Sequence, residues 1–129
     1  LRGIIRFQVC LTLESKMKLH IDNIGGEVVK EDDRYIVTDN KTLNNLVVSS
    51  TELHPGKSTS GHAHVNQEEV YYFVKGSGKM ELIDLNANRT EQNVLAGDVV
   101  LIPDGWFHRV SAGPLGCYFV CVFDGRRTH

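Results

Sequence analysis

Residues 62–69 read HAHVNQEE, which places two imidazoles one residue apart and two carboxylates shortly after them. On an extended segment His62 and His64 point to the same side, because side chains alternate along a strand. Two further candidate ligands are Glu69, which ends this stretch at the start of an apolar run, and His108, which follows a turn later in the chain. Mixed imidazole and carboxylate ligation suits Zn, Fe, Mn, Ni or Cu. These residues therefore form a candidate metal site.

Around this stretch, short runs rich in β-forming residues alternate with turn residues. Gly, Pro, Asn and Asp separate the runs, as in the sequences DN, PG, GSG, NAN and PDG. Regularly spaced short strands are typical of a sandwich or a barrel. The expected strands cover residues 35–38, 46–53, 70–75, 79–85, 98–102, 107–110 and 118–123.

The bulk composition is that of one globular domain. The 129 residues are 41% hydrophobic and 23% charged, with a formal net charge of -2. A basic surplus is missing from the sequence, so we expect no nucleic-acid partner. The sequence also has no run of about 18 apolar residues, so we expect no transmembrane helix and no membrane partner.

Three cysteines, an odd number, argue against a disulfide scaffold and favour a reducing compartment. Cys117 and Cys121 fall within one expected strand, where their Cα atoms would lie roughly 13 Å apart, too far for a bridge. We therefore expect these two thiols to be free and the protein to be cytoplasmic.

The spacing around HAHVNQEE resembles the first motif of the cupin superfamily. That motif reads Gly, five residues, His-x-His, three or four residues, Glu, six residues, Gly. Every fixed position is matched in this chain, by Gly56, His62, His64, Glu69 and Gly76. The glycines fall where strands turn, so positive φ is expected there, and also at Gly97.

The second cupin motif reads Gly, five residues, Pro-x-Gly, two residues, His, three residues, Asn. It is matched by Gly97, Pro103, Gly105 and His108, and Ala112 replaces the final Asn. The family's Asn is not a metal ligand, so the replacement leaves the expected metal site intact.

The resemblance implies a single antiparallel β-barrel of the jelly-roll type, an all-β fold. It also implies that His62, His64, Glu69 and His108 bind one divalent metal ion inside the barrel. We assign residues 17–129 to this cupin domain. Residues 1–16 precede the first methionine and alternate apolar with polar side chains, so they are either an extension or an added strand.

The motif also distinguishes the two adjacent carboxylates, because Glu69 and not Glu68 leaves six residues before the next glycine. Glu68 is then a solvated charge. Tyr71 and Phe73 share a face with Glu69 and, together with Trp106 beside the turn, are candidate substrate contacts. Aromatic residues in a small barrel more often belong to the core.

The fold does not fix the reaction. The favoured interpretation is a metal-dependent enzyme acting on a small polar substrate such as a sugar or sugar phosphate, of the isomerase or epimerase type. The hydroxyl-rich residues 57–61 support it, as does a resemblance to the longer archaeal phosphoglucose isomerase-like cupins. The alternatives are a non-haem Fe or Cu dioxygenase and a non-catalytic small-molecule sensor or binding module.

The expected last strand, residues 117–123, is apolar on both faces. Such a strand is covered on both sides, by the core on one and by another element or subunit on the other. We therefore expect a homodimer.

Overall fold

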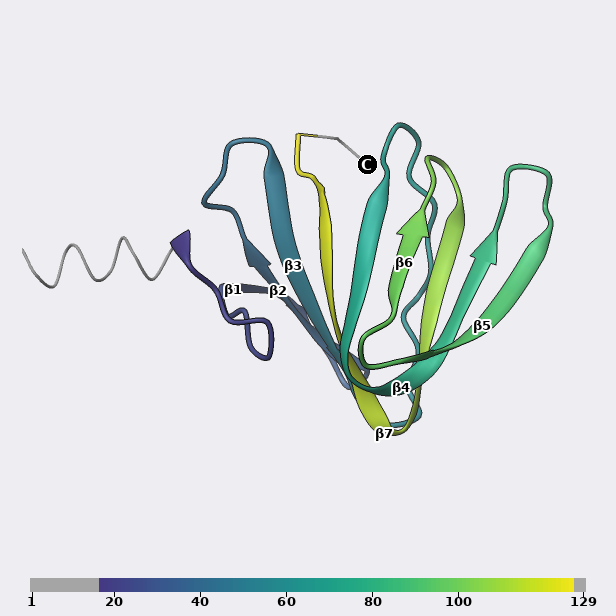
Figure 1. Ribbon diagram of the computed structural model, residues 1–129, viewed down its shortest axis with the longest axis horizontal. Coiled ribbons are helices and arrows are strands. Elements are labelled where there is room, and N and C mark those ends of the chain that lie inside the picture. The colour runs from purple at the N-terminus through teal and green to yellow at the C-terminus, as the bar shows by residue number, and fades with distance from the viewer. Residues whose placement is uncertain (1–16, 127–129) are drawn as a thin grey trace, which may run out of the picture.

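The computed structural model describes residues 17–126, which form one antiparallel system of seven strands. The strands follow the order β1-β2-β3-β7-β4-β5, and β6 pairs with β4 (Figure 1). Their bounds are β1 (Glu27–Glu31), β2 (Tyr35–Asn40), β3 (Leu46–Leu53), β4 (Glu69–Ile83), β5 (Arg89–Leu95), β6 (Val99–Ile102) and β7 (Phe107–Asp124). The predicted all-β jelly-roll barrel is confirmed.

No helix within residues 17–126 has the length and apolar character needed to cross a membrane. The cytoplasmic location stays a prediction. So does the division of the chain at residue 16, because residues 1–16 lie outside the described part.

The long strands β4 and β7 pair over most of their length and form the spine of the barrel. Both bend, so that each contributes to both walls (Figure 1). The register shifts at two places in β4, between Phe73 and Lys75 and between Gly76 and Gly78. Such irregularities increase local twist and let a sheet curl into a barrel.

The turn predicted at residues 76–78 is therefore wrong, because these residues continue β4 as a bend. Gly76 has a φ of +77°, and a Cβ added there would lie 2.1 Å from the carbonyl oxygen of Gly116. Only glycine permits that approach of the two strands at the bend. The prediction of a positive φ at Gly56, Gly76 and Gly97 is confirmed.

Strands β1 and β5 were not predicted, because neither carries a two-residue apolar period. All five residues of β1 are exposed, and in β5 only Val94 is buried. Ion pairs support β5, since Arg89 pairs with Glu81 on the neighbouring β4 and also lies 2.7 Å from Glu91 within β5 itself. The formation of β1 and β5 therefore depends on pairing with the neighbouring strands.

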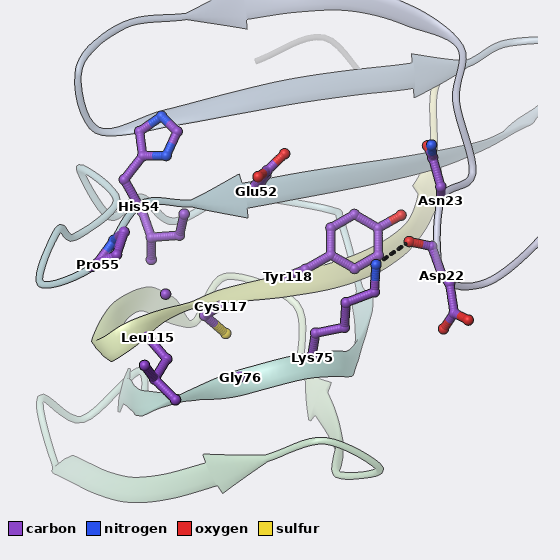
Figure 2. A pocket seen from close by; sticks show the side chains of 12 residues that line it. Asp22, Asn23, Glu52, His54, Pro55, Lys75, Gly76, Leu115, Cys117 and Tyr118 are labelled. Carbon is purple, nitrogen blue, oxygen red and sulfur yellow. Dashed lines mark hydrogen bonds between the residues drawn. The ribbon is translucent and has the colours of Figure 1, made fainter.

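The segment before β1 is fastened to the outer surface of β4 and β7 (Figure 2). The backbone N–H of Ile24 donates to the Tyr118 hydroxyl at 3.1 Å, and Lys75 Nζ donates to the carbonyl oxygen of Asp22 at 2.7 Å. Lys75 Nζ also lies 5.1 Å from the centre of the Tyr118 ring. A hollow of about 320 Å³ lies beside these contacts. The lysine charge is thus used in holding this segment.

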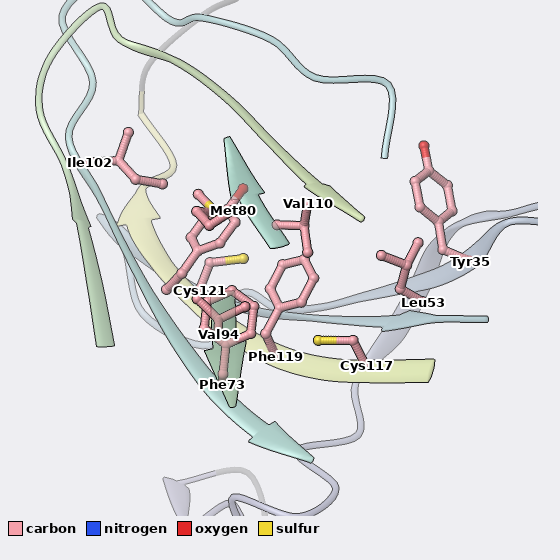
Figure 3. Close-up of a cluster of buried hydrophobic side chains, with 11 residues drawn as sticks. Tyr35, Leu53, Phe73, Met80, Val94, Ile102, Val110, Cys117, Phe119 and Cys121 are labelled. Carbon is pink, nitrogen blue, oxygen red and sulfur yellow. The ribbon is translucent and has the colours of Figure 1, made fainter. Parts of the chain in front are cut away.

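The hydrophobic core fills the interior of the barrel (Figure 3). Its largest fully buried side chains are Phe73, Phe119, Leu53, Met80 and Val110. The rings of Tyr71 and Phe119 stack with centroids 5.0 Å apart. Tyr71, Phe119 and Cys121 belong to this cluster and also line a cavity, so the core forms the floor of the site described next.

Candidate metal centre

A backbone bridge places His62 directly opposite His108. The N–H of each residue donates to the carbonyl oxygen of the other, at 3.1 Å and 3.0 Å. Gly61 makes this approach sterically feasible, because a Cβ at that position would lie 2.5 Å from the Phe107 ring. Residues 46 positions apart in the sequence are thus joined by their main chains.

The turn before His108 is tied to the His64 segment. The N–H of Gly105 donates to the carbonyl oxygen of His64 at 3.1 Å, and the N–H of Trp106 donates to that of Pro103 at 3.2 Å. Asp104 adds its carboxylate, which accepts from the N–H of Asn66 at 2.6 Å. The predicted turn at residues 103–105 therefore holds both halves of the cupin signature together.

Three imidazoles and one carboxylate meet inside the barrel. The ring centroid of His62 lies 4.3 Å from that of His64 and 4.7 Å from that of His108. One ligand atom from each of His62, His64 and Glu69 lies within 4.8 Å of the others, a grouping that could hold a metal ion. His108 approaches the same carboxylate, with its Nε2 3.5 Å from Glu69 Oε2.

A hydrogen bond to the main chain fixes the tautomer of the neutral His108 ring. Its Nδ1 lies 3.0 Å from the carbonyl oxygen of Trp106, and because a carbonyl only accepts, Nδ1 carries the hydrogen. In the neutral ring Nε2 is then an acceptor, buried and without a hydrogen-bond partner among residues 17–126. Two electron-rich atoms face each other, an arrangement that a shared cation stabilises.

Glu69 is held in its ionised form despite its burial. Burial alone would raise the pKa of Glu69, but hydrogen bonding to His108 and the positive charge that His108, His62 and His64 carry when protonated outweigh it and hold the pKa below its ordinary value. An ionised carboxylate among imidazoles is the form that binds a metal ion.

Gln67 is a site residue that the sequence interpretation missed. Its side chain is buried, and its Nε2 donates to Glu69 Oε1 at 2.7 Å. The available signal was its position, two residues before Glu69, which puts both side chains on one side of an extended segment. Glu68, between them, is exposed as predicted.

The histidines and Glu69 open onto a cavity of about 460 Å³, within the range of small-molecule sites. Tyr71 lines it, and burial followed by the nearby Cys121 and Glu69 raises the pKa of its hydroxyl well above the ordinary value. The Tyr71 hydroxyl therefore stays protonated at neutral pH. Polar groups on the wall come from Lys30, Asp39, Ser49, Thr51, Thr59 and Ser60.

The other two aromatic candidates lie elsewhere. Phe73 is 1% exposed within the core, and Trp106 is half-buried and packs against that core. Neither is among the residues that line the cavity. Substrate contact by Phe73 or Trp106 stays a prediction, whereas the cavity position of Tyr71 fits such a role.

The hydroxyl-rich loop is partly used in structure. Ser58 Oγ hydrogen-bonds Ser111 Oγ at 2.8 Å, and Thr59 Oγ1 accepts from the N–H of Val110 at 3.1 Å. Ser60 Oγ accepts from Arg34 Nη1 at 2.7 Å. Thr59 and Ser60 also line the cavity, so the loop forms part of its rim.

An antiparallel barrel whose interior gathers three histidines and a glutamate beside a cavity defines the class of protein: a β-barrel with a candidate metal centre. This chain belongs to the cupin family, because the family model described as "Cupin domain" matches residues 49–123. The predicted membership is confirmed.

Curated relatives carry the name glucose-6-phosphate isomerase. That of Thermococcus onnurineus is 29% identical over 117 residues, covering 81% of this chain and 62% of the relative. That of Pyrococcus horikoshii is 30% identical over 104 residues, covering 74% of this chain and 55% of the relative. The chain thus spans less than two thirds of the length of these relatives.

Among solved structures, variants of Bacillus subtilis oxalate decarboxylase superpose on this barrel. One has a TM-score of 0.70 at 24% identity, covering 78% of this chain and 28% of that chain. Another, with a TM-score of 0.68 at 24% identity, was studied for its Mn(II) centres and covers 74% of this chain and 26% of that chain. At this identity the likeness shows the fold.

Proposed function

We propose that this cupin binds one divalent metal ion through His62, His64, Glu69 and His108 and isomerises a small polar substrate such as a sugar or sugar phosphate. The observation that carries the proposal is the meeting of three imidazoles and an ionised carboxylate, with His108 Nε2 and Glu69 Oε2 facing each other at 3.5 Å.

The donor set fits Mn, Fe, Zn, Ni or Cu, since it mixes imidazole nitrogen with carboxylate oxygen. A bound divalent metal supplies a Lewis acid that polarises a substrate carbonyl or hydroxyl oxygen. Glu69 balances the charge there, and the Trp106 carbonyl keeps His108 turned with Nε2 inward.

Other cavity residues would hold and orient the substrate. The hydroxyls of Ser49, Thr51 and Thr59 line the wall and suit a ligand rich in hydroxyl groups. The raised pKa of Tyr71 makes its hydroxyl a hydrogen-bond donor, not a base. Phe119 and Cys121 on the cavity floor limit the space open to water.

The substrate class is supported by the curated relatives, which bear the name glucose-6-phosphate isomerase. The match covers 81% of this chain. Glucose 6-phosphate and fructose 6-phosphate are therefore the first substrate pair to test.

Metal analysis of the purified protein tests the centre. We expect about one equivalent of metal per chain in the wild type. His62→Ala and His108→Ala should each hold less than about one tenth of that, because each loses one of the four proposed ligands. His54→Ala is the matched control, since His54 lines the outer hollow instead. Unchanged metal content in both site variants would refute the centre.

A coupled assay tests the reaction. After removal of metals with a chelator, each candidate metal is restored separately and interconversion of the sugar phosphates is followed. We expect activity only with metal present and a loss of at least about 100-fold in His108→Ala. Oxygen uptake with Fe or Cu would instead favour a dioxygenase, and metal-independent ligand binding a non-catalytic module.

A further inference from the structure

We propose that Gln67 is a positioning residue that sets the orientation of the Glu69 carboxylate for metal binding. The inference rests on the proposed function, because it assigns Gln67 a role at that same centre. It concerns a residue outside the four proposed ligands.

Each carboxylate oxygen of Glu69 faces a different side chain. Gln67 Nε2 donates to Oε1 at 2.7 Å, and His108 Nε2 lies 3.5 Å from Oε2. A partial rotation of the carboxylate about its Cγ–Cδ bond would break the short hydrogen bond. Gln67 therefore fixes the plane of the carboxylate, so that one oxygen is turned towards Gln67 and the other towards His108.

The amide of Gln67 can take only one orientation at this contact. An ionised carboxylate accepts hydrogen bonds and does not donate them, so the amide nitrogen and not the amide oxygen must face Glu69. Gln67 is 5% exposed, and its Oε1 is buried without a hydrogen-bond partner among residues 17–126. The amide thus gives a hydrogen bond to Glu69 while its own oxygen goes unsatisfied.

This imbalance is informative about the role. The hydrogen bond that Gln67 donates to the carboxylate stabilises the fold, whereas its buried, unsatisfied amide oxygen destabilises the fold by a similar amount. These two effects largely cancel, so Gln67 adds little to stability. A side chain kept for folding alone would not need the amide. A carboxylate that must keep one orientation does need it, because losing a hydrogen bond to a metal ligand typically lowers metal affinity about 10- to 100-fold.

Gln67→Met tests the inference, since methionine keeps the length and flexibility of the side chain but cannot donate. Affinities for Zn²⁺ and Co²⁺ are measured by chelator competition, and the visible spectrum of the Co²⁺ form reports the ligand arrangement. We expect one metal per chain, an affinity lower by about 10- to 100-fold and an altered Co²⁺ spectrum. Glu68→Gln, an exposed neighbour, is the matched control and should change neither.

The melting temperature of the metal-free protein separates positioning from a structural role. Positioning predicts that Gln67→Met weakens metal binding with a metal-free melting temperature within about 2 °C of wild type. A lowered melting temperature with unchanged affinity and spectrum would overturn the inference. If Gln67→Met does not fold, Gln67→Asn is measured in its place. The shorter amide cannot reach Glu69 Oε1, so we expect the same loss of metal affinity.

The two proposals fail in different ways. If the wild type binds one metal and Gln67→Met binds it equally tightly with the same spectrum, the positioning role is wrong and the metal centre stands. If the wild type binds no metal, the proposed function is wrong, and the positioning role falls with it.

Discussion

At the scale of single residues, His108 and Gln67 take their chemical roles from the atoms they contact. The carbonyl of Trp106 holds the Nδ1 hydrogen of His108, and the carboxylate of Glu69 holds the amide of Gln67. Each contact leaves one buried atom without a hydrogen-bond partner in the described part of the chain, His108 Nε2 and Gln67 Oε1. Unsatisfied buried atoms are rare in folded proteins, so two in one cavity point to a binding site.

The two buried cysteines give a prediction at the same scale. Burial raises the pKa of the Cys117 thiol to about 11, and burial together with the nearby Glu69 and Asp39 raises the pKa of Cys121 further. At pH 8 only about one Cys117 in a thousand would be a thiolate, the reactive form. We expect both thiols to react with a disulfide reagent at least about 100-fold more slowly in native protein than in denaturant.

The measurement uses Cys10→Ser, so that only these two thiols are counted. Two equivalents modified within seconds under native conditions would contradict the prediction and indicate that the barrel opens readily.

At the scale of elements, the bend in β4 decides how the barrel closes. Gly76 adopts a left-handed conformation beside Gly116 of β7, and the register of the pair shifts on either side of it. This bend lets one strand reach from Glu69 at the metal centre to Ile83 in the opposite wall. A glycine expected to end a strand instead redirects it.

We predict that Gly76→Ala destabilises the fold by about 3 kcal/mol or more, because the new methyl group would combine backbone strain with a clash against the Gly116 carbonyl. Gly56→Ala should lose only about 1 kcal/mol, since Gly56 also has a positive φ, +71°, but nothing lies within 4 Å of its Cβ position. Urea unfolding of the two variants measures the difference. Equal losses would show that strain alone accounts for both.

Comparing the predicted strands with β3 and β7 shows how far a local sequence pattern predicts a strand. Residues 46–53 were predicted as a strand and form β3 with those bounds, although burial does not alternate along it: Ser49, Ser50 and Thr51 are all buried. Residues 111–116 were not predicted, since Gly113 and Pro114 interrupt the pattern, yet they lie within β7. There, pairing with β4 and β3 outweighs the local preference of the sequence.

At the scale of the whole molecule, the barrel presents an apolar outer face. Val70 of β4 pairs with Leu101 of β6 and Val122 of β7, and Tyr72 pairs with Val99. All five side chains are exposed, and paired residues share a face of the sheet. The face includes Val122 of β7, and the sequence predicted that this strand is covered on both sides.

The homodimer stays a prediction, and this face is where we expect it to form. Leu101→Lys should convert a dimer into a monomer at micromolar concentration, because it places a charge in the middle of the face. Leu115→Lys is the control, since Leu115 is 87% exposed at the outer hollow. Light scattering measures both, and a monomeric wild type would contradict the prediction.

The sequence by itself determined the family, the all-β class and the four proposed ligands, because these depend on residue spacing and on the two-residue period of a strand. Tertiary structure decided the rest. It joined His62 to His108 and changed a predicted turn at Gly76 into a bend. It also paired β1 with β2 and β5 with β4, and it buried Gln67 against Glu69. Those features depend on contacts between residues far apart in the chain or on the burial of a polar group, and the spacing of residues in the sequence specifies neither.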